Sequence, residues 1–249
     1  MQEIIIVGMP RTGSTFMGMA LVQHPSIYAP TAPNAMEPFH PTLFPGASQE
    51  PWKTVDYHVS MAHRHYPQAT HLLYKVMFDQ VRFKLEDYLR RLDPCSRVIH
   101  MTRNPIVSYA SHTAARRTKI WNIWTEEARA KLQLGNVPPN IPMIVRCCRA
   151  HEISGRFWRD VFPNAHTVTY SDLNHRAAEV LAGVYAYLGL PPCAAAGTTL
   201  RIDGRRARDR YSDYDRIAKE LPERYLHYLD EVDEEYVADP PPSKEGKAE

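Results

Sequence analysis

The chain has 249 residues, of which 44% are hydrophobic and 23% charged, and 30 basic against 28 acidic residues leave a net charge of +2. This composition excludes a disordered, collagen-like or coiled-coil protein. The balanced charge argues against non-specific binding to nucleic acid or to an anionic membrane, so an anionic ligand must be bound by a local cluster of cations. The four cysteines show no CxxC spacing and no apolar run reaches the roughly 20 residues of a membrane span, so we expect a cytoplasmic protein with reduced thiols.

The first residues predict a strand, a glycine loop and a helix. Residues 4–7 are a short β-branched apolar run, typical of a strand buried on both faces, and a turn containing Gly8 and Gly13 follows. From Ser14 onward apolar residues recur at helical spacing until Pro25 ends the helix. Later patterns predict strands at residues 72–77, 98–102 and 165–170, and helices at 81–92, 144–161 and 177–188.

Strands that alternate with helices predict βαβ units, and therefore an α/β fold with a mainly parallel central sheet flanked by helices. We assign residues 1–238 to one such domain, in which residues 28–70 and 115–145 form loops or a lid, and expect residues 239–249 to be a disordered tail. In such sheets ligands bind beyond the carboxyl ends of the strands. The site is therefore expected in the loops that follow residues 7, 77, 102 and 170.

Residues 8–15, GMPRTGST, lie between a buried strand and the start of a helix. Backbone N–H groups and the helix dipole bind anions at such a place, and the hydroxyls of Thr12, Ser14 and Thr15 add hydrogen-bond donors. The loop has both glycines of the Walker A motif, but Ser14 replaces the motif's lysine and the cation is Arg11. Nucleoside triphosphate hydrolysis is disfavoured, because this lysine and a magnesium-binding carboxylate are both missing. An ordinary glycine turn is the alternative interpretation of the two glycines.

A second anion site is predicted after the strand at residues 98–102. Arg103 ends this strand, and Asn104 and Pro105 are typical of an N-cap and a first helical residue. Ser111 lies eight residues beyond Arg103, a little over two helical turns, so both side chains can face one phosphate. Two anion sites on neighbouring loops predict a ligand with two separated phosphates.

These motifs resemble those of the PAPS-dependent sulfotransferase family, and are most similar to its bacterial carbohydrate-type members. The family's sulfuryl donor, 3′-phosphoadenosine 5′-phosphosulfate (PAPS), carries phosphates at the 5′ and 3′ positions of ribose. MPRTGSTF at residues 9–16 is similar to the family's 5′-phosphosulfate loop, and RNPIVSYAS at 103–111 is similar to its 3′-phosphate motif. YSDL at 170–173, YLGLP at 187–191 and SDYD at 212–215 follow in the family's order. The resemblance spans residue 3 to about residue 230.

The resemblance implies a P-loop-NTPase-like sulfotransferase fold and transfer of a sulfuryl group from PAPS to a hydroxyl of a carbohydrate or small natural product. It implies no metal, and it places the loops at 28–70 and 115–145 on the acceptor side. A monomer and a homodimer both remain open. The residues implied to bind PAPS and its product PAP are Arg11, Thr12, Gly13, Ser14, Thr15, Phe16, Arg103, Ser111, Tyr170, Arg205 and Arg206.

The catalytic base departs from one pattern of the family and matches another. Cytosolic members carry a basic histidine two residues after a lysine, but here the second residue after Lys75 is Met77. Bacterial members often carry a glutamate in the loop after the first helix, and Glu37 in the segment MEPF matches it. Glu37 is therefore our candidate for the general base, with His40 and His65 as the alternatives. A solvated surface glutamate is the plain interpretation of Glu37.

Arg11 and Lys75 are the cations expected at the sulfuryl group or at the leaving phosphate. Lys75 has the alternative interpretation of a lysine that extends from a strand end to solvent. The basic run at residues 201–210, with Arg205 and Arg206, is either a solvated helix face or a loop that closes over a phosphate. The histidines between residues 58 and 71 lack a metal-ligand spacing, so a partly exposed helix is favoured over a metal site.

Two other functions share part of this pattern. A nucleotide kinase or NTPase with a degenerate P-loop would share the strand, loop and helix, but it would need the missing lysine and a magnesium ligand. A non-catalytic module that binds PAP would need Arg103 and Ser111 but not Glu37. Binding of PAP, ADP and ATP with and without magnesium separates these alternatives.

Overall fold

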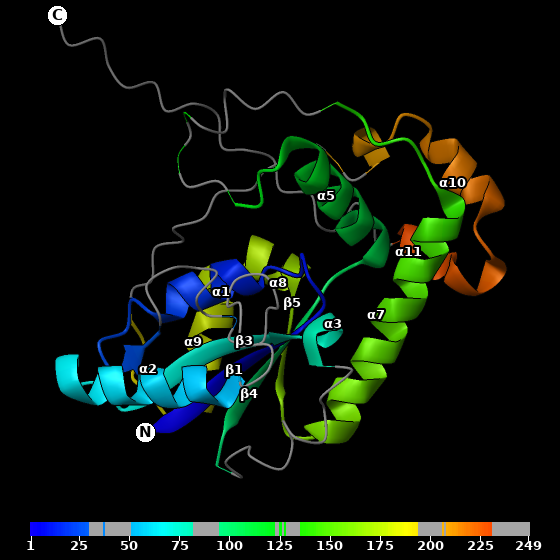
Figure 1. The fold of residues 1–249 in the computed structure, drawn as a ribbon. Coiled ribbons are helices and arrows are strands. Elements are labelled where there is room, and N and C mark those ends of the chain that lie inside the picture. Colours follow the sequence, from blue (N-terminus) through cyan, green and yellow to red (C-terminus); the bar gives the residue numbers. More distant parts are fainter. Residues whose placement is uncertain are drawn as a thin grey trace, which may run out of the picture.

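A computed structural model of the chain describes residues 1–29, 37, 51–81, 95–122, 125, 127, 135–193, 206 and 208–230. At residues 51–54 and 81 it describes the backbone only. Nearly all of the helix predicted at 81–92 and the whole tail predicted at 239–249 lie outside these residues. The described residues include the five-stranded central sheet and the helices that pack on it (Figure 1).

The described strands form one five-stranded sheet in the order β2-β3-β1-β4-β5, and every pairing is parallel. This confirms the α/β fold with a mainly parallel sheet. Strand β1 is central because its apolar residues 4–7 are completely buried. Gly8 at its end pairs with Met77 of β3 and Met101 of β4, so the three strands end at one level. The strands are β1 (Gln2–Gly8), β2 (Ile27–Tyr28), β3 (His71–Met77), β4 (Arg97–Thr102) and β5 (His166–Thr169).

The helices follow the strands along the chain, and most of them match the predicted ranges. The N-cap prediction at Asn104 is confirmed, since its side chain accepts hydrogen bonds from the N–H groups of Ile106 and Val107. The described helices are α1 (Ser14–Leu21), α2 (Pro51–His65), α3 (Phe78–Val81), α5 (Pro105–Thr118), α7 (Ile141–Val161), α8 (Tyr170–His175), α9 (Ala177–Leu188), α10 (Tyr214–Glu220) and α11 (His227–Asp230), with 3-10 turns η1 (Arg208–Arg210) and η2 (Glu223–Tyr225).

Helix α2 lies inside the segment 28–70, which was expected to form loops or a lid. The frequent prolines before residue 51 suggested irregular structure, but Pro51 is the first residue of α2, a position that proline favours. Val55, Val59 and Ala62 then recur at helical spacing and pack against the sheet. The stretch after the last proline therefore carried a helical pattern.

Two apolar layers cover the two faces of the sheet. Ile4 and Ile6 of β1 pack with α1 and α9, whereas Ile5 and Val7 pack with α2 and α7, because neighbouring residues of a strand point to opposite faces. Figure 1 shows α2 and α7 in front of the sheet and α1 and α9 behind it. Among the described residues, no helix has the length and hydropathy needed to cross a membrane.

A third apolar cluster joins α5 and α7 to the C-terminal elements. Ile106 and Ile144 pack there with Tyr211 and Ile217, and the Tyr211 hydroxyl donates a 2.6 Å hydrogen bond to the carbonyl of Ile106. The side chain of Asn104 donates to the carbonyl of Tyr228 at 2.7 Å. Figure 1 shows α10 and α11, in orange and red, beside α7. These contacts anchor the end of the described chain next to the carboxyl end of β4.

We expect the stability of the fold to fall in mild acid because His100 on β4 is buried. Burial and the nearby Arg159 lower the pKa of His100 to about 4. The unfolded chain takes up this proton near pH 6.5 and the folded chain only near pH 4, so stability falls as the pH falls between these values. The loss from this histidine is about 3 kcal/mol.

Urea unfolding at pH 7 and pH 4.5 measures this effect. His151 contributes in the same direction, because burial and Arg103 also lower its pKa to about 4. The comparison is therefore made between wild type and His100→Gln, whose side chain does not titrate. An equal loss of unfolding free energy in both proteins would contradict the assignment to His100.

Candidate functional site

The loop from Gly8 to Gly13 has a conformation that neighbouring elements require. A Cβ atom on Gly8 would lie 2.5 Å from the carbonyl oxygen of Met101, and one on Gly13 would lie 2.7 Å from the ring of Tyr170. Gly13 has a φ of 87°, in the region that favours glycine. Arg11 also has a positive φ, 72°, which is uncommon for a residue with a side chain. The loop therefore has a specific conformation, held between β4 and α8.

The side chain of Arg11 connects this loop to α5. Its Nε donates a hydrogen bond to the Ser111 hydroxyl at 3.2 Å, and its Nη1 donates to the carbonyl of Trp121 at 2.6 Å. Burial and the nearby Arg103 lower the pKa of Arg11 to about 10, so it remains charged at neutral pH. The structure thus brings the cation of the first predicted anion site to the serine of the second.

Arg103 lies against the same loop from the end of β4. Its Nη1 donates to the carbonyl of Arg11 at 2.9 Å, and its guanidinium carbon lies 3.8 Å from the centre of the Tyr170 ring. Tyr170 is the first residue of α8, one residue beyond the end of β5, where a strand end had been expected. Two guanidinium groups therefore lie together at the loop, and their positive field favours an oxyanion.

The hydroxyl groups of the loop have different partners. Thr12 and Ser14 are buried, and their hydroxyls contact the carbonyl of Met9 at 2.8 Å and the sulfur of Met77 at 3.9 Å, respectively. These two side chains hold the loop together in this structure. Phe16 is partly buried against the apolar layer of α1 and α9. Thr15 is different, since its hydroxyl accepts a hydrogen bond from Lys75 at 3.2 Å.

Lys75 and Glu37 form an ion pair near the end of β3, in which Lys75 is buried and Glu37 is partly buried. Lys75 is only 1% exposed, and its Nζ lies 2.8 Å from Glu37 Oε1. A buried ammonium group is costly unless it is paired and hydrogen-bonded, and Glu37 and Thr15 supply these partners. Leu73, two residues before Lys75, belongs to the layer of α1, so Lys75 faces α1. Lys75 therefore does not extend to solvent, which was its alternative interpretation.

Gln80 is a residue of this site that the sequence analysis missed. Its Oε1 accepts a hydrogen bond from the N–H of Met77 at 3.0 Å, and its Nε2 donates to Glu37 Oε2 at 2.8 Å. One oxygen of Glu37 is thus held by Lys75 and the other by Gln80. Gln80 could have been identified from the sequence as a polar side chain just after β3, in one of the loops where the site is expected.

The remaining predicted site residues are either exposed or lie outside the described residues. His40 and Arg205 lie outside the described residues. His65 is exposed at the last residue of α2. Arg206 is exposed, and its carbonyl accepts a hydrogen bond from the N–H of Asp209 at 3.1 Å. Within the described ranges, no three side chains of His, Cys, Asp or Glu are placed to hold a metal ion.

The site therefore consists of two clusters of side chains on either side of one loop. Arg11, Arg103 and Ser111 lie on its β4 side, and Lys75 and Glu37 lie on its β3 side. The N-terminus of α1 lies between them and favours an anion through its N–H groups. This arrangement can bind two anionic groups of one ligand and can place a carboxylate and an ammonium group beside one of them.

Comparisons with known proteins show a family match in the N-terminal segment and a shared fold. Residues 3–83 match the profile of the sulfotransferase family. A sulfotransferase from Alicyclobacillus acidocaldarius is 15% identical, with a TM-score of 0.53 over 91% of this chain and 96% of that one. The sulfotransferase domain of the Synechococcus PCC 7002 olefin synthase is 16% identical, with a TM-score of 0.51 over 97% and 96% of the two chains. A sulfotransferase domain from the curacin biosynthetic pathway is 14% identical, with a TM-score of 0.51 over 89% and 99%.

A comparison with curated protein sequences gave no match. At these identities the three solved structures establish the fold, which is a parallel sheet with a P-loop-like turn after its central strand. The family match covers the segment that carries this turn, Glu37 and Lys75. The similarity to the sulfotransferase family therefore covers residues 3–83, and the similarity to the solved sulfotransferase structures is one of fold.

Proposed function

We propose that the protein transfers a sulfuryl group from PAPS to a hydroxyl group of a carbohydrate or small natural product. The observation that carries this proposal is the contact of Arg11 with both Ser111 and Arg103. It joins the loop that resembles a 5′-phosphosulfate site to the two residues that resemble a 3′-phosphate site. A ligand with phosphates on both ends of one ribose suits this pair of neighbouring anion sites.

In this proposal Arg103 and Ser111 bind the 3′-phosphate, and the loop from Arg11 to Thr15 binds the 5′-phosphosulfate. The Ser111 hydroxyl accepts a hydrogen bond from Arg11 in the structure, and its own proton is available to a phosphate oxygen. The ring of Tyr170 contacts the guanidinium group of Arg103 and helps to hold it in place. Arg205 and Arg206 complete the 3′-phosphate site if the basic loop closes over it.

The reaction is an in-line displacement at sulfur. The acceptor oxygen forms a bond to sulfur, the bond between sulfur and the bridging oxygen of the 5′-phosphate breaks, and PAP leaves. Glu37 takes the proton of the acceptor hydroxyl. A carboxylate has about four lone-pair positions, and Lys75 and Gln80 use two of them, so Glu37 can accept a further hydrogen bond from the acceptor. Arg11 and Lys75 stabilise the negative charge that develops on the transferred group and the phosphate.

Two further expectations belong to this proposal. Catalysis needs no metal ion, because Arg11 and Lys75 supply the positive charge that a metal supplies in phosphoryl transfer. A cytoplasmic location suits the thiols of Cys147, Cys148 and Cys193, which are free in the structure. The adjacent pair at 147 and 148 lies on α7, inside the fold.

Calorimetry with PAP in the presence of EDTA tests the binding part of the proposal. We expect wild type to bind PAP without magnesium. Arg103→Ala removes charge-assisted hydrogen bonds and should weaken PAP binding by about 10- to 100-fold, and Ser111→Ala by about fivefold. Arg116→Ala removes an equal charge from an exposed position of α5 and should leave the affinity unchanged.

The same titrations separate the competing functions. Loss of PAP binding in EDTA, or ATP binding as tight as that of PAP, would indicate a degenerate P-loop kinase or NTPase. Transfer of radiolabelled sulfate from PAPS to an extract of the source cell then tests catalysis. Tight PAP binding without any transfer would indicate a non-catalytic module.

A further inference from the structure

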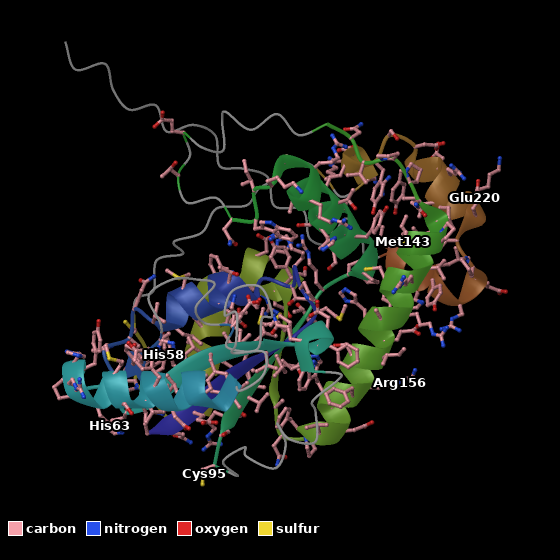
Figure 2. The ribbon with its side chains drawn as sticks, viewed as in Figure 1. His58, His63, Cys95, Met143, Arg156 and Glu220 are labelled. Atoms are coloured by element: carbon pink, nitrogen blue, oxygen red, sulfur yellow. The ribbon has the colours of Figure 1, made fainter. Side chains whose placement is uncertain are left out.

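A groove lies between α7 and the turn η2, apart from the proposed donor site. It has a volume of about 570 Å³, and its described lining includes none of the residues proposed to bind PAPS. Arg149, Ile153 and Arg156 line it from α7, and their spacing of four and three residues places them on one face of the helix. All three are exposed, and Figure 2 shows Arg156 on α7. This groove, called the arginine groove below, is therefore open to solvent.

The arginine groove carries a surplus of positive charge. Arg149, Arg156 and Arg224 line it, and Glu152 is the single carboxylate among its described lining residues. Glu152 pairs with Arg224 at 3.0 Å. Over the described residues, no carboxylate forms an ion pair with Arg149 or Arg156. Two guanidinium groups are therefore left for a partner with carboxylates, which arginine binds through parallel hydrogen bonds.

Apolar side chains accompany these charges. Val145 and Tyr225 in the wall belong to the apolar cluster that joins α7 to the C-terminal elements. Ile153 is 40% exposed in the same wall, and Leu226, just after η2, is 37% exposed. Covering such aliphatic side chains with a partner is favourable. The groove therefore fits a peptide segment in which acidic and apolar residues are mixed.

The described part of the chain ends beside this groove. Tyr225 of η2 lines the groove, and α11 follows η2 after one residue and ends at Asp230. Helix α11 is held in place, because the carbonyl of Tyr228 accepts a hydrogen bond from Asn104 and Leu229 packs in the same apolar cluster. Figure 1 shows α11 beside α7. The sequence after residue 230 therefore starts from a fixed point near the arginine groove.

The next residues of the sequence have the opposite charge to the groove. Residues 231–239, EVDEEYVAD, contain five acidic residues and no basic residue, with two valines and a tyrosine among them. They lie outside the residues that the structure describes. Nine residues reach about 30 Å when extended, whereas Arg149 and Arg156 are about 10 Å apart along α7. The segment is therefore long enough to contact both arginines.

We propose that residues 231–239 bind in the arginine groove of the same chain. Acidic side chains of the segment pair with Arg149 and Arg156, and its apolar side chains cover Ile153. Exposed ion pairs are weak one by one, but the segment is attached next to the groove, so its effective concentration there is high. The proposal concerns α7 and the segment after α11, and it does not depend on the proposed function.

Limited proteolysis of the full chain with chymotrypsin tests this proposal. Chymotrypsin cuts after Tyr236, and the intact mass then reports the loss of residues 237–249. A protease needs unbound chain around the cut, so a bound segment is cut slowly. The groove variant Arg149→Glu/Arg156→Glu should be cut about fivefold faster than wild type at low salt, because the segment is released. High salt screens exposed ion pairs, so it should accelerate the cut in wild type and not in the groove variant.

A matched control and a charge exchange accompany the groove variant. Arg64→Glu/Arg116→Glu changes the net charge equally at exposed positions of α2 and α5, and it should leave the rate of the cut unchanged. The segment variant Asp233→Arg/Glu234→Arg should also release the segment from the wild-type groove. Combined with the groove variant it should be cut about threefold more slowly than alone, since opposite charges face each other again. The two proteins compared share one segment sequence, so the preference of the protease cancels.

Equal cutting rates in wild type and in the groove variant would overturn the proposal. A charge exchange that fails to slow the cut would also overturn it. Protection that increases with protein concentration would show that the segment binds the groove of a second copy, which contradicts binding within one chain. PAP takes no part in these measurements, so failure of the proposed function would leave their outcome unchanged.

Discussion

Glu37→Gln should lower turnover by about 10² to 10⁴, the usual contribution of a general base. Glutamine keeps the shape of the side chain and can still accept a hydrogen bond from Lys75, but its amide cannot take the proton of the acceptor hydroxyl. PAP affinity should change by less than about twofold, because Glu37 is not among the residues proposed to bind PAP, which include the loop, Arg103 just after β4 and Ser111 on α5. Steady-state transfer of radiolabelled sulfate at saturating PAPS measures the turnover.

Two controls distinguish loss of the base from loss of its position. Gln80→Ala removes the hydrogen bond that holds Glu37 Oε2, so turnover should fall by about tenfold while the base remains. His65→Ala and His40→Ala should retain turnover. If Glu37→Gln retains turnover and one of the histidine variants loses it, that histidine is the base and the assignment of Glu37 is wrong.

Lys75→Met should lower turnover by about 10² to 10³, because it removes a cation beside the transferred group. Methionine has nearly the length of lysine and fills the buried space along β3 without a charge. The free energy of unfolding should also fall, because the Glu37 carboxylate loses the cation that pairs with it. Urea unfolding measures this, and Lys219→Met on the exposed side of α10 is the control for turnover.

The contact between Lys75 and Glu37 also predicts how the effects of the two substitutions on turnover combine. Lys75 and Glu37 contact each other, so the double variant should lose little more than the more damaged single variant. If the two decreases in turnover multiply in the double variant, the two side chains act independently. Unchanged turnover in Lys75→Met, with an intact fold, would leave Lys75 a structural role only.

Local patterns in the sequence were enough to predict most elements around the site. The apolar run at residues 4–7, the glycines of the loop and the helical spacing after Ser14 each depend on neighbours within a few residues, and the structure has β1, the turn and α1 at these places. Asn104 and Pro105 likewise predicted the start of α5, because capping involves only the first turn of a helix. The histidines after residue 58 favoured a helix, but its start at Pro51 was not predicted, because the prolines before it dominated the composition of the segment.

Only the tertiary structure decided which of these residues meet. Arg11 contacts Ser111 across 100 residues, and Gln80 contacts Glu37 across 43. Such contacts depend on the order of the strands in the sheet, which periodicity along one sequence does not contain. The structure likewise gives the partners of the Thr12 and Ser14 hydroxyls, the carbonyl of Met9 and the sulfur of Met77, while their contact with a ligand stays a prediction. The structure also brings Arg156 of α7 and Arg224 of η2 to the wall of one cavity with Arg103, and these segments are far apart in the sequence.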